Sequence, residues 1–438
     1  MTTFVNRIRE MDELTALAAR GGLVVISGRR RVGKTRLLSH WLRTNHGVFA
    51  QAIEGAPEIQ LDQLMRDFQA GSAVLSTSIE PKNWSEFFEM IHLAKLTGPV
   101  CIDEFPYLVE SDPTLPSVIQ RFIDHKMPKG MTLILAGSSL RMMHSTFLDR
   151  SAPLYGRARK ILRIAPMSYE AFTKACGEKL SAKTSFEKFS LVGGIPKYWE
   201  FCDSKASPIA LAEALFFGFA PYFSEEPSRL LRDEGIAGMN PLSVLEAIGR
   251  GAAKPSEIAA KMGVAQPNLT RILDALVDAS IISRTLPFGE SSRATKRVLY
   301  RIADPALRFH FHVYSPHRAR WQGYRQDKKQ ELLATHVGPM FEQWWRETHA
   351  GSSPYWEASV EFDSVRLDER AGTTRAIVTE LKWGELTAAD RIRLEERVRM
   401  QWNASSLFAK YGPCEVEVID STFFKDTVAV KSLCAEKR

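Results

Sequence analysis

The amino-terminal third of the chain is organised around three continuous apolar runs, at residues 23–27, 99–102 and 131–136. Runs of this length without polar alternation are typical of strands buried on both faces, as in a parallel sheet covered by helices. The first run is followed, after a short polar segment, by apolar residues with helical spacing at residues 37–42. This pattern predicts an α/β domain with a parallel sheet.

A basic, glycine-bearing segment separates the first apolar run from the helix and has the sequence Gly-Arg-Arg-Arg-Val-Gly-Lys-Thr. Its two glycines allow backbone N–H groups to turn inward around a phosphate, and the helix N-terminus adds a favourable dipole. Lys34 is expected to reach the β and γ phosphates of ATP, and the Thr35 hydroxyl to ligate Mg²⁺. The predicted binding loop for ATP or ADP consists of Gly28, Arg29, Arg30, Arg31, Val32, Gly33, Lys34, Thr35 and Arg36.

Polar residues close the other two apolar runs, where the carboxyl ends of parallel strands bind ligands. Asp103 and Glu104 follow the second run. We expect Asp103 to hold Mg²⁺ through water and Glu104 to act as general base for the attacking water, with ordinary turn acids as the alternative. Ser138 or Ser139, after the third run, is expected to orient water near the γ-phosphate; capping of the next helix is an equal alternative.

The middle of the chain predicts short helices followed by a hairpin. A helix begins at Pro255 and ends at Gly263, and a second spans residues 268–277. The segments 281–284 and 297–302 then flank a loop that carries Arg293 and Lys296. This order is typical of a winged helix-turn-helix that binds DNA, and a packing module within a multidomain ATPase is the equal alternative. The exposed side chains of the second helix are expected to be Gln266, Asn268, Thr270 and Arg271.

The carboxyl-terminal part predicts two strands, at residues 359–365 and 376–383. Period-2 alternation places Glu380 and Lys382 on one face of the second strand. If the two strands form a hairpin across a polar loop from residue 366 to residue 375, Asp363 converges with that pair. Carboxylates in this arrangement bind a hard cation such as Mg²⁺, and the lysine orients water or stabilises charge during phosphodiester cleavage. A structural α/β domain and an inactive nuclease fold are the alternatives.

Taken together, these motifs resemble the archaeal-type ATPases of the AAA+/STAND group, P-loop ATPases. Further matches are the entry segment at residues 4–7, the segment Leu154–Arg157 and the segment Gly193–Tyr198. The resemblance implies that Arg157 acts as an arginine finger on the γ-phosphate, with Arg159 as the alternative. It also implies that Pro196 fixes a turn of a helical lid near the adenine. Because arginine fingers often act between subunits, it is compatible with a homo-oligomer.

The carboxyl-terminal motif resembles the PD-(D/E)xK restriction-endonuclease-like family, and in particular the domain that accompanies archaeal-type ATPases. Glu342, on a helix, joins Asp363, Glu380 and Lys382 in this resemblance. It implies metal ligation by Glu342, Asp363 and Glu380 and catalysis by Asp363, Glu380 and Lys382. The expected domains are an ATPase core (1–165), a helical lid (166–235), a winged helix (236–320) and an α/β restriction-endonuclease-like domain (321–438).

Composition narrows the functional class. The 438 residues carry a net charge of +7, which favours a polyanionic partner such as DNA. The start of the chain lacks an apolar signal segment and the sequence has no apolar run of about 18 residues, so we expect a cytoplasmic protein without a membrane partner. The predicted function is ATP binding and hydrolysis coupled to DNA binding and Mg²⁺-dependent cleavage; the alternative is a STAND-like switch with an inactive carboxyl-terminal interaction module.

Overall fold

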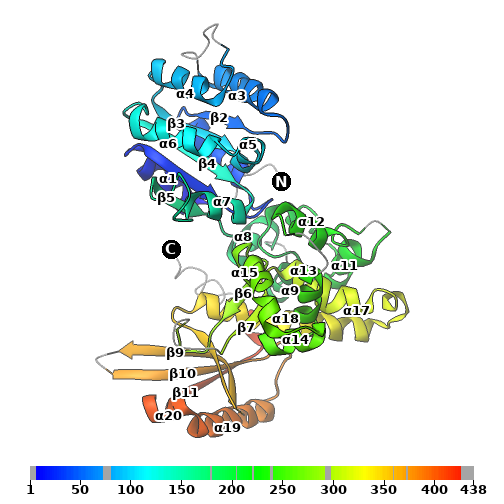
Figure 1. Cartoon of the computed structure of the whole chain (residues 1–438). Helices are drawn as coiled ribbons and strands as arrows, with labels where there is room; N and C mark the ends of the chain where they lie inside the picture. The colour runs from blue at the N-terminus through cyan, green and yellow to red at the C-terminus, as the bar shows by residue number, and fades with distance from the viewer. Residues whose placement is uncertain are drawn as a thin grey trace.

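A computed structural model describes residues 6–72, 80–177, 180–203, 205–219, 221–236, 240–291, 297–358, 360–370 and 373–425. Phe4, Val5, Arg293, Lys296 and Ser359, which the sequence analysis singled out, lie outside these residues. Figure 1 shows one sheet with its helices at the amino-terminal end, a helical middle, and a second sheet in the carboxyl-terminal part. None of the helices in these ranges is both long and apolar enough to cross a membrane.

The first sheet has five strands in the order β2-β3-β4-β1-β5, and every pairing is parallel. The strands are β1 (Gly22–Ser27), β2 (Val48–Gln51), β3 (Gly98–Asp103), β4 (Met131–Gly137) and β5 (Ala158–Arg163). The predicted α/β domain with a parallel sheet is therefore confirmed. All seven residues of β4 are buried, as expected for a strand with helices on both faces.

In the described residues this sheet is accompanied by the helices α1 (Ile8–Ala18), α2 (Lys34–Thr44), α3 (Pro57–Gly71), α4 (Trp84–Leu93), α5 (Phe105–Ser111), α6 (Leu115–His125) and α7 (Leu140–Phe147). Alternate residues of β1 pack into two different apolar clusters. Val24 and Ile26 pack on the side of α1 and α2, whereas Leu23 and Val25 pack on the side of α3 and α4. Both faces of β1 are thus buried, which fixes the position of the loop that follows it.

The helical middle contains α8 (Tyr169–Phe172), η2 (Thr173–Gly177), α9 (Ala182–Val192), α10 (Pro196–Trp199), α11 (Pro208–Ala212), η3 (Glu213–Phe217) and α12 (Glu226–Asp233). Its aromatic side chains do not form a separate core. Phe186 of α9 packs against Trp344 and Phe424, which come from the last quarter of the chain. The apolar cluster therefore continues from the first sheet through the lid into the carboxyl-terminal part, across the domain boundaries that the sequence predicts.

The predicted helix-turn-helix segment and its hairpin are present as α13 (Asn240–Gly249), α14 (Pro255–Met262), η4 (Gln266–Leu269), α15 (Thr270–Asp278), β6 (Ile282–Thr285) and β7 (Leu299–Ile302). The strands β6 and β7 pair antiparallel. Gly263 ends α14 in the left-handed conformation, which a glycine adopts without strain. The chain continues through α16 (Pro305–Phe309), η5 (His310–Tyr314), α17 (Ser315–His317) and η6 (Trp321–Gly323).

The carboxyl-terminal part combines a long helix with a four-stranded sheet in the order β11-β10-β9-β8. Its elements are α18 (Gln326–Thr348), β8 (Ser353–Glu357), β9 (Val360–Arg370), β10 (Thr373–Leu381), α19 (Ala388–Ala404), α20 (Ser406–Tyr411), β11 (Cys414–Ile419) and η7 (Ser421–Lys425). The strands β8, β9 and β10 pair antiparallel, whereas β11 pairs parallel to β10.

The prediction of a loop from Arg366 to Arg375 is wrong. Both strands extend into that segment, and their ladder continues to the pair Thr373 and Arg370. The polar residues had suggested a loop, but polar residues that alternate with apolar ones are also compatible with a strand that has one solvent-exposed face. The predicted hairpin itself is confirmed.

Candidate functional site

The glycines of the loop between β1 and α2 are required by the backbone. Gly33 has a φ of 98°, which strains any residue with a side chain. A Cβ atom on Gly28 would lie 2.7 Å from the carbonyl oxygen of Ile164, because the loop runs against the segment that follows β5. These two positions let the loop curl tightly at the carboxyl end of β1, with α2 starting at Lys34. The predicted order of strand, loop and helix is therefore confirmed.

The Lys34 side chain folds over the loop. Its ammonium donates to the carbonyl oxygens of Gly28, at 2.7 Å, and Arg29, at 3.2 Å. Burial lowers the pKa of Lys34, while the carboxylates of Glu104 and Asp103 oppose that shift. A buried ammonium whose partners among the described residues are carbonyl oxygens is well placed to exchange them for the oxygens of a phosphate.

Thr35 and Asp103 meet at the carboxyl edge of the sheet. The Thr35 hydroxyl donates to Oδ2 of Asp103 at 2.6 Å, and the backbone N–H of Glu104 donates to Oδ1 at 2.9 Å. The Asp103 side chain is fully buried, and this burial raises its pKa. One hydroxyl and one carboxylate, both oxygen donors, fit a hard cation such as Mg²⁺, so the residues present match the ion that the motif implies.

Glu104 lies beside Ser138, which extends from the end of β4. The Ser138 hydroxyl donates to Oε2 of Glu104 at 2.6 Å. Glu104 has a φ of 54°, a strained backbone conformation for a residue with a side chain, and such conformations concentrate at functional sites. Ser139 instead caps α7, because its hydroxyl accepts from the N–H of Met142. The two serines that the sequence could not separate therefore have different partners.

The three arginines of the loop bind carboxylates on other parts of the chain, which the sequence analysis did not anticipate. The ion pairs are Arg29 with Asp304 at 2.9 Å, Arg30 with Asp233 at 2.6 Å, and Arg31 with Glu226 at 3.2 Å. Arg31 also donates to the Tyr222 hydroxyl. Asp233 and Glu226 lie on α12, and Asp304 precedes α16. The loop is thus connected directly to the lid and to the helix that follows the hairpin, and phosphate binding by the three arginines stays a prediction.

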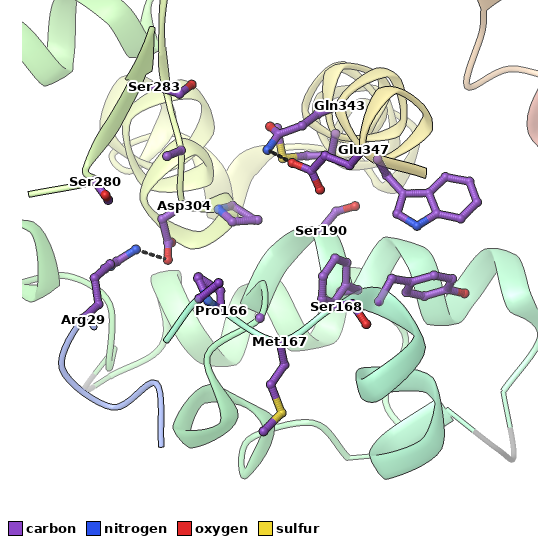
Figure 2. A pocket seen from close by; sticks show the side chains of 18 of the residues that line it. Arg29, Pro166, Met167, Ser168, Ser190, Ser280, Ser283, Asp304, Gln343 and Glu347 are labelled. Atoms are coloured by element: carbon purple, nitrogen blue, oxygen red, sulfur yellow. Dashed lines mark hydrogen bonds and ion pairs between the residues drawn. The ribbon is translucent and has the colours of Figure 1, made fainter. Parts of the chain in front are cut away.

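A cavity of about 570 Å³ lies where the loop, the lid and α18 meet. Figure 2 shows the pair of Arg29 and Asp304 on one side of it and Gln343 and Glu347 of α18 on the other. The segment from Arg163 to Glu170, which leads from β5 into the lid, forms another part of the wall. Gly28 and Arg29 of the nucleotide loop therefore line the same cavity as α18, the helix that begins the carboxyl-terminal part.

Glu234, at the end of α12, docks the lid onto the amino terminus of α7. Its carboxylate accepts from the N–H of Arg141 at 3.4 Å, and the residue is 3% exposed. Burial raises its pKa to about 7 from an ordinary value of 4.5. The folded protein therefore holds this proton more tightly than the unfolded chain, and its free energy of unfolding falls as the pH rises from about 4.5 to about 7.

The Glu234→Gln variant is expected to remove this pH-dependent loss, since a neutral amide carries no charge to bury. Its melting temperature should match that of the parent near pH 5 and exceed it at pH 8, where the buried charge costs the parent roughly 3 kcal/mol. Thermal unfolding across this range measures the effect, with the exposed Glu225→Gln as matched control. A difference between variant and parent that does not change with pH would contradict the prediction.

Arg157 does not approach the nucleotide loop of its own chain. Its guanidinium pairs with Asp124 at 2.9 Å and donates to the carbonyl oxygen of Pro153. It precedes β5, whose first residue pairs with Leu23 near the start of β1, so it lies at the amino edge of the sheet. Arg159 bonds to the carbonyl oxygen of Gly21 near the same edge. A finger role for Arg157 within one chain is therefore excluded by the strand direction, and a role between chains stays a prediction.

Pro196 is the first residue of α10, where its missing N–H costs no helical hydrogen bond. The turn before it is tightly packed: a Cβ on Gly194 would lie 2.1 Å from the carbonyl oxygen of Met167. The Trp199 indole donates to the carbonyl oxygen of Gly193 at 2.7 Å. The predicted lid turn is therefore closely packed, while contact with adenine stays a prediction.

The carboxyl-terminal hairpin gathers Asp363, Glu380 and Lys382 at one end of its ladder. The Lys382 ammonium lies 2.8 Å from Oε1 of Glu380 and 3.7 Å from Oδ2 of Asp363. The N–H of Leu381 donates to the same Asp363 oxygen at 2.8 Å. Burial, with the charges of Glu342 and Glu380, raises the pKa of Asp363 to about 7. The predicted convergence of these three side chains is thus present.

Two arginines complete this cluster and were missed by the sequence analysis. Arg397 of α19 pairs with Glu380 at 2.5 Å, and Arg346 of α18 donates to the carbonyl oxygen of Asp363 at 2.6 Å. Glu342 pairs with Arg346 at 3.6 Å and with Arg301 at 3.8 Å. Within the described ranges, no group of three or more His, Cys, Asp or Glu residues is arranged to hold a metal ion. The three-carboxylate metal site that the resemblance implies is therefore not preformed, because Glu342 lies between two arginines.

Residues 4–200 match the model for an ATPase domain found predominantly in Archaea, and residues 242–286 match the MarR family model. An uncharacterized protein of Methanocaldococcus jannaschii is 27% identical over 421 residues, which cover 88% of this chain and 89% of that protein.

Two solved structures were also similar. The Walker-type ATPase of Pyrococcus abyssi aligns with a TM-score of 0.54 and 20% identity over 71% of this chain and 96% of its own, which shows a shared fold. The ORC2 protein of Aeropyrum pernix aligns with a TM-score of 0.42 and 13% identity over 78% of this chain and 97% of its own. With the loop geometry, the family match identifies the amino-terminal part of the chain as a domain of the P-loop ATPase type.

Proposed function

We propose that the protein is an ATP-hydrolysing enzyme that acts on DNA, with its P-loop domain coupled to a DNA-binding winged helix and to a Mg²⁺-dependent nuclease domain. The observation that carries the ATPase part is the 2.6 Å contact between Thr35 and Asp103 beside Lys34 and Glu104. A loop lysine, a hydroxyl and two carboxylates at the end of a buried strand form the set that phosphoryl transfer requires.

In this proposal Lys34 binds the β and γ phosphates, and Thr35 and Asp103 would hold Mg²⁺. Bound Mg²⁺ supplies neutralisation of the phosphate charge. Glu104 accepts a proton from the attacking water, whose oxygen forms the new bond to the γ-phosphorus while the bond to the β–γ bridging oxygen breaks. Ser138 holds the Glu104 carboxylate in one orientation through its hydroxyl.

The winged-helix part of the proposal depends on an exposed polar surface. Gln266 and Asn268 of η4 and Thr270 and Arg271 at the start of α15 are all exposed. In this class of motif the second helix contacts the major groove. Ser280, just after α15, is bonded to Arg163 at the end of β5. This bond offers a direct route by which movement of the P-loop domain would reach the DNA-binding surface.

The nuclease part depends on the cluster at the end of the hairpin. Asp363 and Glu380 supply oxygen donors that fit Mg²⁺, and Lys382 lies beside both. Lys382 would stabilise negative charge on the scissile phosphate, and Arg397 holds Glu380 in place. Bound Mg²⁺ would polarise the phosphate and lower the pKa of a water molecule.

A second candidate is a STAND-like switch whose carboxyl-terminal domain is a catalytically inactive interaction module. This candidate is favoured by the ion pairs that join the loop to α12 and to Asp304, made by Arg29, Arg30 and Arg31. A nucleotide that displaces these pairs would release the lid from the loop and so change the position of the lid. DNA separates the two candidates, since only the first requires it.

Duplex DNA is expected to stimulate ATP turnover and to bind with an affinity that falls by roughly tenfold or more between 50 and 200 mM salt, as phosphate contacts require. Filter binding and an ATPase assay at the two salt concentrations measure both. Arg271→Ala is expected to weaken binding, whereas Arg66→Ala, an exposed arginine of α3, serves as matched control. If the DNA affinity does not depend on salt and the ATP turnover does not change with DNA, the switch is favoured and the DNA-processing proposal is removed.

A further inference from the structure

The proposed ATPase lacks an arginine at the γ-phosphate if Arg157 is the only candidate. Arg157 pairs with Asp124 near the amino edge of the sheet, whereas the loop that binds phosphate follows the carboxyl end of β1. Phosphoryl transfer places negative charge on the γ-phosphate oxygens, and Lys34 and one bound cation neutralise only part of it. A further cation is therefore expected on the side of Glu104.

Arg30 is the arginine of the loop that lies on the side of Glu104. Its guanidinium donates to the hydroxyl of Tyr107 as well as to Asp233. Tyr107 lies on α5, which begins directly after Glu104, so the Arg30 side chain extends from the loop toward the general base. Burial opposes the charge of Arg30, and among the negative groups that raise its pKa is Glu104. The positive charge of Arg30 in turn contributes to the lowered pKa of Lys34, after the larger effect of burial.

The neighbouring arginines extend elsewhere. Arg29 is closed off against Asp304, as Figure 2 shows, and Arg31 points to Tyr222 and Glu226 of the lid. The exposed fraction of the side chain is 6% for Arg29, 23% for Arg31 and 38% for Arg30. Arg30 is therefore the loop arginine that can change partners with the least loss of buried contacts.

We propose that Arg30 acts in cis as the arginine finger of this ATPase. Its guanidinium separates from Asp233 and binds the γ-phosphate of the ATP held by its own loop. The inference rests on the proposed ATPase function. In the reaction water adds to the γ-phosphorus, the bond to ADP breaks with its electron pair going to ADP, and Glu104 takes the proton of the water. Arg30 donates hydrogen bonds to the γ-phosphate oxygens throughout and gives up no proton.

The first test compares the full-length parent with Arg30→Ala and Arg157→Ala in steady-state ATP hydrolysis and ATP binding. Arg30→Ala is expected to lower kcat on the order of 10²-fold, with the dissociation constant for ATP within about threefold of the parent. Arg66→Ala, at an exposed arginine of α3, is the matched control and should keep the kcat of the parent. The reverse result, in which Arg157→Ala loses turnover and Arg30→Ala keeps it, would overturn the proposal.

A purely architectural role for the ion pair is tested with Asp233→Asn, which breaks the pair but keeps Arg30. This variant is expected to retain kcat within about threefold of the parent, because only the guanidinium reaches phosphate. A loss as large as that of Arg30→Ala would show that the pair merely holds α12, and would sink the inference. Arg30→Gln, which keeps much of the side-chain length, provides a second variant should Arg30→Ala unfold.

Trapping of ADP with aluminium fluoride supplies a readout that would not change if Arg30 had a purely structural role. The parent is expected to retain the complex, whereas Arg30→Gln should bind ADP equally well and fail to trap it, since the missing contact belongs to the transition state. Equal trapping by both would count against the inference.

Mixing two inactive variants distinguishes action in cis from action between chains. Lys34→Ala keeps an intact Arg30, so a mixture of Lys34→Ala with Arg30→Ala regains turnover only if a finger enters from another chain. We expect no recovery, and recovery would refute the cis assignment. A parent without any ATP turnover would remove the proposed function and this inference together, whereas an active parent with an equally active Arg30→Gln would remove the inference alone.

Discussion

Replacing Glu104 with glutamine is expected to lower the turnover number for ATP by about 10³-fold and to leave the affinity for ATP within about threefold of the parent. Glutamine has the same shape and still accepts the hydrogen bond that Ser138 donates, so the backbone and its neighbours keep their positions. What disappears is the group that takes the proton of the attacking water. Isothermal titration with ATP and a phosphate-release assay measure the two quantities separately.

The matched control is Lys34→Ala, which should lose nucleotide binding itself. Its ammonium lies over the loop and donates to the carbonyl oxygens of Gly28 and Arg29. The affinity for ATP is expected to fall by roughly 100-fold, with turnover falling accordingly. Retained turnover in either variant would contradict the assignment of this loop and of Glu104 to ATP hydrolysis.

The nucleotide loop was predictable because its information is local. A buried strand, two glycines, a lysine and a helix follow one another without a gap, and each residue type has its own physical requirement. Asp103 and Glu104 were also predictable, since the end of a parallel strand lies at the ligand-binding edge wherever that strand falls in the sheet. The contact between Thr35 and Asp103 follows from these two local signals.

The partners of Arg29, Arg30 and Arg31 could not be predicted in this way. Asp304 and Asp233 lie 275 and 203 residues along the chain from their arginines, so their pairing depends on how the lid and α16 fold back. Arg157 failed as a finger within one chain for a related reason. The motif identifies the residue, but the direction of β5 decides which edge of the sheet it occupies.

The carboxyl-terminal site was predictable in its hairpin and incomplete in its surroundings. Alternation placed Glu380 and Lys382 on one face, and the ladder pairs Ser364 with Thr379, which sets Asp363 opposite Glu380. Arg346 and Arg397 come from helices whose packing no local pattern specifies. They matter physically, because each brings a positive charge to a cluster where burial raises the pKa of Asp363.

The Arg30 ion pair links the site to the rest of the molecule. The loop that would receive ATP contacts α12 through Asp233 and Glu226, and Glu234 of the same segment docks on α7. Because α7 follows Ser138 and Ser139, the lid contacts both sides of the nucleotide site. Binding of nucleotide is therefore expected to change the contacts of α12 first, and through α12 those of the helix-turn-helix that follows it.

Lys382→Ala is expected to lower Mg²⁺- or Mn²⁺-dependent cleavage of plasmid or single-stranded DNA by about 10³-fold, because the ammonium beside Glu380 and Asp363 is the charge that would stabilise the scissile phosphate. ATP turnover measured without DNA should be unchanged, since the two sites share no residue. Nicking assays with and without EDTA measure the effect, and chelation should abolish cleavage by the parent. Lys425→Ala, an exposed lysine paired with Glu385, is the matched control and should cleave like the parent. Equal nicking by Lys382→Ala and the parent would remove the nuclease assignment and leave the carboxyl-terminal domain as an interaction module.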